Sequence, residues 1–372
     1  MKIVIVGGHL APALGLIDSL PREDTVVFIG RKFAIEGDKV LSLEFQEINS
    51  RNIPFLVLAG GRFQRSFSSQ TLPSLSRIPL AVFQAVTYLR RVQPDVVLSF
   101  GGYLSVSVGI AAKMLRIPLV IHEQTLEAGL ANKILAPFAS KICISWENSR
   151  PFFPSTKVVL TGNPLKIFTK KVFDLPFSSS DQKLPLLYVT GGSTGSHAIN
   201  MLVENGLDML TRTFCVIHQT GDTTEFGDYE RLVIKKAALP ELQRARYHIQ
   251  KYVTSDQIGE IMDKATIIMS RSGINTVTEL IFFGKPALLI PLPHGQKGEQ
   301  IKNAQFLQKL GLATVLPQEN ASSEAVHSLL THMLTKRDEY KAVMKTAKAT
   351  LHPNAPQEII ETLSYVVQKK NS

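Results

Sequence analysis

The chain has 372 residues, of which 44% are hydrophobic and 19% are charged, so we expect two globular domains and exclude a disordered or fibrous protein. The formal net charge of +10 indicates a negatively charged partner. Neither zinc-finger spacing nor an aromatic RNA-binding strand occurs, so we expect no nucleic acid among the partners.

The start of the chain leads directly into a strand-like segment at residues 2–6 and does not resemble an export signal. No apolar run reaches the roughly 18 to 20 residues that span a bilayer. Cys143 and Cys215 lie far apart, each in an apolar segment, and we expect two reduced core thiols. These features predict a protein of a reducing compartment, the cytoplasm.

Buried strands recur along the first part of the chain. Short apolar, β-branched runs, each followed by a helical pattern, occupy residues 2–6, 25–29, 55–58, 96–99, 119–121, 141–144 and 158–160. Continuous runs of this kind are typical of parallel strands that are covered on both faces. The sequence therefore predicts an α/β domain over residues 1–163.

A second series of buried strands follows a polar linker at residues 164–183. Its runs occupy residues 184–190, 214–218, 247–249, 266–269, 286–290 and 313–315. We expect a second Rossmann-like domain over residues 184–355, facing the first across a cleft. A helical stripe at residues 356–370 is expected to pack back on the first domain.

A glycine-rich turn joins strand and helix at the start of the second domain, where the sequence reads Gly-Gly-Ser-Thr-Gly-Ser from Gly191 to Ser196. Such a turn lets backbone N–H groups and the positive end of a helix approach a phosphate. We interpret it as a diphosphate site; the alternative is a tight turn that merely needs glycine.

Two later segments could hold the rest of a nucleotide sugar. After the strand at residues 266–269, Asn275 and Glu279 lie one helical turn apart, and Glu279 is the candidate for the ribose hydroxyls. Gln300 and Asn303, three residues apart on a helix, could bind sugar hydroxyls.

Polar residues also follow the strands of the first domain. His9, directly after Gly7 and Gly8, is the candidate for a general base. Tyr103, His122 and Glu123 follow two further strands and should reach the same rim. Glu123 is interpreted as a cleft carboxylate, whereas for His122 a structural role is equally open.

Metal ligands are not evident. The sequence has no Asp-x-Asp pair and no His, Cys or Glu cluster with metal-ligand spacing, so backbone dipoles should meet leaving-group charge without a metal.

A basic, apolar segment lies between residues 62 and 94. It contains five arginines and no acidic residue, which favours contact with an anionic membrane surface through residues 62–91. The alternative is that Ile78, Val82, Val86 and Leu89 form an ordinary core stripe and the arginines are solvated.

These segments together resemble the MurG family of GT-B-fold glycosyltransferases (family 28) over nearly the whole chain. The most specific pieces are GGHLAPAL (7–14), FGGYLS (100–105), HEQTLEAGLANK (122–133), TGNP (161–164), GGSTGS (191–196), SRSGINTVTEL (270–280) and GKPALLIPLP (284–293).

The resemblance implies inverting transfer of N-acetylglucosamine (GlcNAc) from UDP-GlcNAc to an undecaprenyl-diphosphate-linked muramyl-pentapeptide at the cytoplasmic membrane face, with no cofactor beyond the donor. His9, or else Glu123, would deprotonate the acceptor hydroxyl. The implied donor residues are Gly192, Ser193, Gly195, Ser272, Gly273, Glu279, Gln300, Asn303 and Lys166. The implied acceptor residues are Gly7, Gly8, Tyr103, His122, Thr125 and Asn132.

The chain departs from the family in four places. Its first loop is shorter than the usual Gly-Gly-Thr-Gly-Gly-His, Thr125 replaces an asparagine, and Lys166 replaces an arginine. Gly298 and Glu299 replace the usual residues before Gln300. Three alternatives stay open: transfer to another lipid-linked or glycan acceptor, epimerisation of UDP-GlcNAc, and UDP-GlcNAc binding without transfer.

Overall fold

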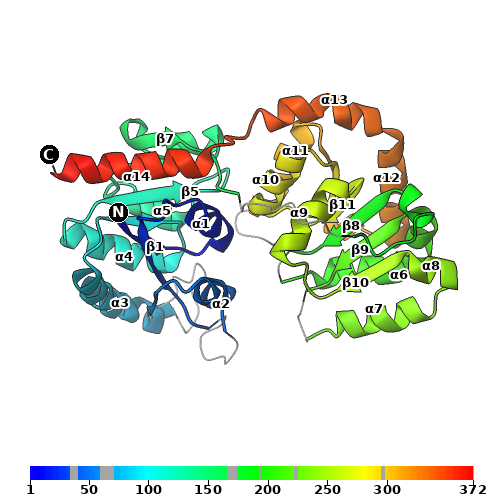
Figure 1. Cartoon of the computed structure of the whole chain (residues 1–372), viewed down its shortest axis with the longest axis horizontal. Coiled ribbons are helices and arrows are strands. Elements are labelled where there is room, and N and C mark those ends of the chain that lie inside the picture. The colour runs from blue at the N-terminus through cyan, green and yellow to red at the C-terminus, as the bar shows by residue number, and fades with distance from the viewer. Residues whose placement is uncertain are drawn as a thin grey trace. The chain divides into compact units, whose positions relative to one another are not determined.

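The computed structural model describes residues 1–33, 41–58, 71–165, 174–192, 194–221, 225–294 and 298–371, with the backbone alone at residues 71–78, 255, 256 and 371. Its contacts divide the chain into a first unit of residues 1–167 with 352–372 and a second unit of residues 168–351 (Figure 1). We call these the first and second domains; the expected linker, 164–183, is divided between them.

The first domain is built on a seven-stranded parallel sheet with the order β3-β2-β1-β4-β5-β6-β7. Every expected strand is present: β1 Lys2–Val6, β2 Thr25–Gly30, β3 Phe55–Val57, β4 Val96–Ser99, β5 Leu119–Glu123, β6 Lys141–Ile144 and β7 Val158–Leu160. The apolar runs are continuous because successive residues face opposite sides of a sheet, and here both sides are covered.

Two helical layers cover this sheet. On one face, α3 (Thr71–Val92), α4 (Tyr103–Met114) and α5 (Leu130–Leu135) pack against Val4, Val6 and Val97. On the other face, α1 (Leu10–Ile17) and α2 (Leu43–Ser50) pack against Ile3 and Ile5. The alternating residues of β1 therefore contribute to two separate cores.

The last helix of the chain, α14 (Ala355–Asn371), belongs to the first domain (Figure 1). Ile359, Ile360, Leu363 and Val366 join the same apolar core as α1 and α2. The helix also contacts β4 and β6, so residues from opposite ends of the sequence share one core.

The second domain is built on a six-stranded parallel sheet with the order β10-β9-β8-β11-β12-β13. Its strands are β8 Leu186–Thr190, β9 Cys215–Gln219, β10 Tyr247–Gln250, β11 Ile267–Ser270, β12 Ala287–Leu289 and β13 Ala313–Val315. Its helices are α6 His197–Thr213, α7 Asp228–Ala237, α8 Glu241–Ala245, α9 Ser255–Lys264, α10 Ile274–Phe283, α11 Glu299–Lys309, α12 Ser323–Thr335 and α13 Arg337–Lys348. On one face, α6 and α12 enclose an apolar core with Leu187, Val189 and Val216.

Both sheets reverse their strand order beside the first strand, between β1 and β4 in one domain and between β8 and β11 in the other. The chain departs on opposite faces at such a point and leaves a crevice at the carboxyl ends of the strands, where ligands of open α/β sheets bind.

Two expectations from composition can be compared with this fold. Cys143 and Cys215 are both free and buried, as expected. No helix within the described part of the chain is long and apolar enough to cross a membrane.

Candidate functional site

Two glycine loops of the first domain meet at the β1/β4 switch point. The N–H of Gly8, after β1, donates to the carbonyl of Gly101, after β4, at 3.1 Å. A Cβ atom added to Gly7 would lie 2.7 Å from the Cβ of Phe100, too close for any larger residue without movement. The loops approach each other so closely because glycine occupies these positions.

His9 lies at this junction as the N-cap residue of α1, where its side chain makes no capping hydrogen bond. Loss of solvation lowers the pKa of its half-buried imidazole to about 4. The ring is therefore neutral near pH 7 and can accept a proton. Tyr103, also half-buried, begins α4 at the neighbouring loop.

The third polar segment of the first domain lies deeper than its sequence suggests. β5 runs to Glu123, two residues beyond its expected end, because His122 and Glu123 pair in register with Cys143 and Ile144 of β6. His122 is fully buried, and its Nε2 lies 3.0 Å from the carbonyl oxygen of Gly162. Burial lowers the pKa of this imidazole to about 4, so it is a neutral donor that connects β5 to the loop after β7.

Glu123 organises the loop that follows it. Glu123 is only 1% exposed, and both of its carboxylate oxygens accept hydrogen bonds. One accepts from the Thr125 N–H at 3.0 Å and the Thr125 hydroxyl at 2.6 Å; the other accepts from the Gly129 N–H at 2.8 Å and Asn132 Nδ2 at 2.9 Å. His122, Glu123, Thr125 and Asn132 thus hold one another in place.

The glycine loop of the second domain lies at the β8/β11 switch point. Gly192 has a positive φ of +88°, and a Cβ atom added there would meet nothing within 4 Å. Gly195 has a φ of +79°, but a Cβ atom there would overlap the Thr220 carbonyl after β9. The loop therefore leaves one glycine open on one side while its other end packs closely against the neighbouring strand.

The loop after β11 forms the other wall of this switch point. Gly273 precedes α10, and an added Cβ atom would again meet nothing within 4 Å. The buried Ser272 hydroxyl donates to the Gln300 carbonyl at 2.7 Å, and buried Asn303 donates from Nδ2 to the Ser272 carbonyl at 3.0 Å. These two side chains fix α11 against the loop.

Of the two amides expected to contact sugar, Gln300 is the less enclosed. Gln300 is half-buried, and its Oε1 accepts from the Leu292 N–H at 3.0 Å. Asn303 is 0% exposed. Glu279 is half-buried on α10. Burial of the Tyr188 phenol on β8 is the main cause that raises its pKa, and the negative charge of Glu279 raises it further. Glu279 therefore lies within electrostatic reach of β8.

Arg271 is a site residue that reasoning from sequence missed, although its position directly after β11 could have pointed to it. Its guanidinium donates to Ser196 Oγ at 3.0 Å, the Ile290 carbonyl at 2.9 Å and Gln318 Oε1 at 2.7 Å. All three acceptors are neutral, and desolvation lowers the pKa of Arg271. A positive charge therefore lies at the N-cap of α6. Two expected donor residues, Ser193 and Lys166, lie outside the described residues.

Solved proteins with this two-domain architecture have the GT-B fold. The crystal structure of Acinetobacter baumannii MurG has a TM-score of 0.71 at 24% identity and covers 98% of this chain and 99% of that one. UDP-GlcNAc 2-epimerase from Neisseria meningitidis, bound to UDP-GlcNAc, has a TM-score of 0.63 at 16% identity and covers 98% and 100%. At these identities the likeness shows the GT-B fold alone.

Sequence relatives give the particular family. Residues 6–144 match the glycosyltransferase family 28 N-terminal domain, and residues 186–359 match its C-terminal domain. A relative from Oenococcus oeni, described as UDP-N-acetylglucosamine–N-acetylmuramyl-(pentapeptide) pyrophosphoryl-undecaprenol N-acetylglucosamine transferase, is 31% identical over 384 residues, which cover 100% of this chain and 98% of the relative. This chain belongs to glycosyltransferase family 28, and the resemblance inferred from its motifs is confirmed.

The two glycines of the second-domain loop allow a matched test of close packing. Gly195→Ala should lower the free energy of unfolding of the second domain by about 2 kcal/mol more than Gly192→Ala, because both substitutions strain a positive φ but only the first forces overlap with backbone. Urea unfolding followed by circular dichroism measures this difference, while fluorescence of Trp146, the one tryptophan of the chain, reports on the first domain. Equal losses in the two variants would contradict the packing argument.

Proposed function

We propose that this glycosyltransferase transfers GlcNAc from UDP-GlcNAc to undecaprenyl-diphosphate-linked muramyl-pentapeptide, in peptidoglycan synthesis. The observation that carries the proposal is the glycine loop at the β8/β11 switch point, open at Gly192 and Gly273 and bordered by the Arg271 guanidinium. The printed activity of the Oenococcus oeni relative, which this chain matches over its full length, supports the same substrates.

The second domain would bind the donor. The loop that carries Gly192, Ser193 and Gly195 would hold the diphosphate at the positive end of α6, and Arg271 adds a full positive charge there. The N–H groups of Gly192 and Gly195 already donate to Thr190 Oγ1 and to the Gly192 carbonyl, both at 3.1 Å, so these two glycines would serve by allowing close approach of the phosphates. Glu279 would accept from the ribose hydroxyls and Gln300 would contact GlcNAc. Because Ser272 and Asn303 bond to their neighbours, we give them the role of positioning α11. Lys166 stays a predicted donor contact.

The first domain would bind the acceptor through its Gly7, Gly8 and Tyr103 rim, with His9 as the base. In one displacement, the acceptor hydroxyl oxygen attacks C1 of GlcNAc, its proton passes to the neutral His9 imidazole, and the C1–O bond to UDP breaks with inversion. We give Glu123 a positioning role instead of a share in proton transfer, because its carboxylate is buried and accepts four hydrogen bonds. His122, Thr125 and Asn132 would shape the same rim.

The developing charge on UDP would be met by the loop dipoles and Arg271, without a metal or other cofactor. Among the described residues, no group of three His, Cys, Asp or Glu side chains is arranged to hold a metal ion. Metal independence remains a prediction, and a chelator tests it directly.

We also propose that the first domain contacts the anionic cytoplasmic face of the membrane. Residues 59–70 lie outside the described part, but α3 exposes Leu80 and Phe83 (60% and 70%) while Val86 and Leu89 enter the core. The helix therefore has both the core stripe and an exposed apolar strip, with Arg90 and Arg91 exposed in its last turn.

A basic hollow at the amino ends of β5 and β6 supports this assignment. It has a volume of about 440 Å³ and is lined by Lys113, Arg116, Lys141, Lys369 and Lys370, together with Tyr365. Cations around exposed aromatic and apolar side chains suit anionic headgroups.

Transfer of labelled GlcNAc to a water-soluble analogue of the proposed acceptor, diphosphate-linked muramyl-pentapeptide with a short lipid, tests the proposed reaction in the presence of EDTA. The wild type should be active; His9→Ala should lower kcat by about 10² to 10⁴, since it removes the base, and Glu279→Ala should raise the KM for UDP-GlcNAc about tenfold. His332→Ala, at an exposed position of α12, is the control. Binding without transfer would favour another acceptor or a binding role, and epimerisation without acceptor would favour the epimerase alternative.

The pH dependence of kcat/KM tests His9 separately. Only the neutral imidazole is a base, and burial lowers its pKa to about 4, so the rate should stay level from pH 8 to about 5 and fall below that as His9 is protonated. Circular dichroism at each pH should show an unchanged fold. A fall centred near pH 6.5, the ordinary histidine value, would contradict burial of the base.

Sedimentation with vesicles containing phosphatidylglycerol tests membrane contact. Leu80→Ser with Phe83→Ser should weaken binding more than tenfold, because two apolar side chains no longer enter the bilayer interface. Ile234→Ser with Leu242→Ser, at exposed positions of the second domain, is the matched control. Equal binding by the wild type and both variants would contradict the proposed membrane contact. Loss of transfer to the water-soluble acceptor in the Leu80→Ser, Phe83→Ser variant alone would also contradict it.

A further inference from the structure

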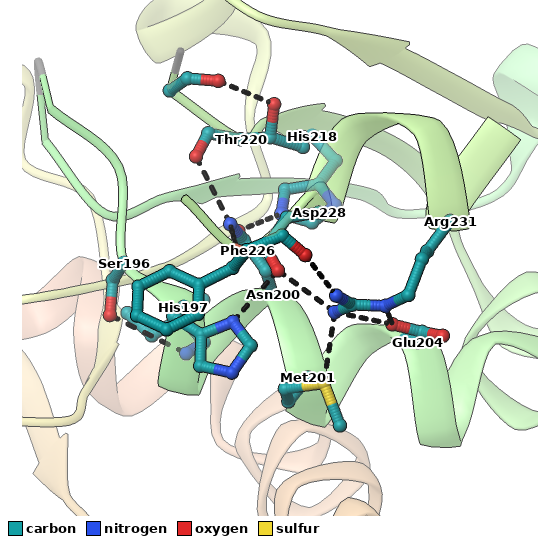
Figure 2. A network of polar contacts seen from close by, with 12 residues as sticks. Ser196, His197, Asn200, Met201, Glu204, His218, Thr220, Phe226, Asp228 and Arg231 are labelled. Carbon is teal, nitrogen blue, oxygen red and sulfur yellow. Dashed lines mark hydrogen bonds and ion pairs between the residues drawn. The ribbon is translucent and has the colours of Figure 1, made fainter. Parts of the chain in front are cut away.

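A buried chain of hydrogen bonds runs behind the glycine loop of the second domain. Tyr247, His218, Asn200 and Asp228 come from β10, β9, α6 and α7, and none is more than 3% exposed. The elements that carry them are distant in sequence, and the side chains of His218, Asn200 and Asp228 converge beside Thr220, directly after β9 (Figure 2).

The direction of each hydrogen bond can be assigned from Asn200 outward. Asn200 Nδ2 donates to the Thr220 carbonyl at 3.1 Å and to Asp228 Oδ2 at 2.7 Å, which uses both of its hydrogens. Asn200 Oδ1 must then accept from His218 Nε2 at 3.1 Å, and His218 Nδ1 accepts from the Tyr247 hydroxyl at 2.8 Å. This pattern requires a neutral His218, and burial indeed lowers its pKa to about 3.

Asp228 is the charged residue at one end of this chain of hydrogen bonds. Burial alone would raise its pKa, but hydrogen bonds from Asn200 and His197 outweigh that effect, and the pKa is lowered. His197 Nδ1 lies 2.7 Å from Oδ1, and the Arg231 guanidinium donates to Oδ1 at 2.8 Å. Asp228 therefore presents a fixed carboxylate to Asn200, since its other oxygen is held from two sides.

The buried chain of hydrogen bonds reaches the glycine loop through the Thr220 carbonyl group. A Cβ atom added to Gly195 would overlap the Thr220 carbonyl, and a Cβ atom added to the next residue, Gly221, would lie 2.4 Å from the Thr194 carbonyl oxygen. The glycine loop thus rests on the Thr220–Gly221 turn. Asn200 holds that turn from α6, the helix that the glycine loop itself begins.

We infer that Asn200, held by Asp228 and His218, is a positioning residue that sets the backbone of the glycine loop for the donor diphosphate. The inference rests on the proposed function, in which this loop binds the diphosphate of a nucleotide sugar. Asn200 itself would not touch the donor. Its effect is confined to the diphosphate and should not extend to the nucleoside.

Binding of UDP and of uridine to the full chain, measured by isothermal titration calorimetry, tests this distinction. Asn200→Ala should weaken UDP binding at least tenfold and uridine binding less than twofold, because the backbone of the glycine loop and the start of α6 lose their alignment while the nucleoside contacts stay. The matched control is Thr211→Val on the same helix, which removes a buried hydroxyl bonded to the Leu207 carbonyl at 2.8 Å. It should leave the UDP-to-uridine affinity ratio unchanged.

Equal weakening of both ligands by Asn200→Ala, or an unchanged affinity for both, would overturn the positioning role. If Asn200→Ala does not fold, Tyr247→Phe takes its place, with an expected loss of about threefold for UDP alone; a wild-type ratio in that variant would overturn the role as well. Failure of the proposed function has a different signature, because the wild type itself would then bind UDP no more tightly than uridine.

Discussion

The reversal of strand order in each parallel sheet is the constraint on which the candidate sites depend. β1 and β4 in the first domain, and β8 and β11 in the second, are neighbours in the sheet although they are separated in sequence. The loops that leave their carboxyl ends therefore lie side by side without covering each other. Glycine loops occupy these positions in both domains, which gives each domain one candidate ligand-binding rim.

Close backbone approach decides the composition of these rims. Gly7 lies against Phe100, and Gly195 lies against Thr220, so each loop is held by contacts that a side chain would prevent. Gly192 and Gly273, by contrast, face open space. The glycines thus serve two separate purposes, since some let two loops approach each other and others keep the space beside the loop free of side chains.

Buried polar side chains support the rims from behind. In the first domain, Glu123 accepts four hydrogen bonds and orders the segment that ends at Asn132. In the second, Asp228 and His218 hold Asn200 against Thr220. Each buried carboxylate has donors on both oxygens, which is the condition under which burial of a charge is tolerated. Rigid support of this kind lets a loop present its N–H groups without rearrangement.

The sequence by itself determined the strands, the two α/β domains, the glycine loops and the family, because these depend on local patterns of apolar residues and on contiguous motifs. It also placed His9 just beyond β1 and Glu279 on the helix that follows β11. Only the tertiary structure decided which polar residues face inward. β5 extends through His122 and Glu123 because β6 pairs with them, and Asn303 is buried because the loop after β11 accepts its amide hydrogen. Asn200 and Arg271 gave no periodic signal, since their partners come from segments far apart in the sequence that meet only when the sheet forms.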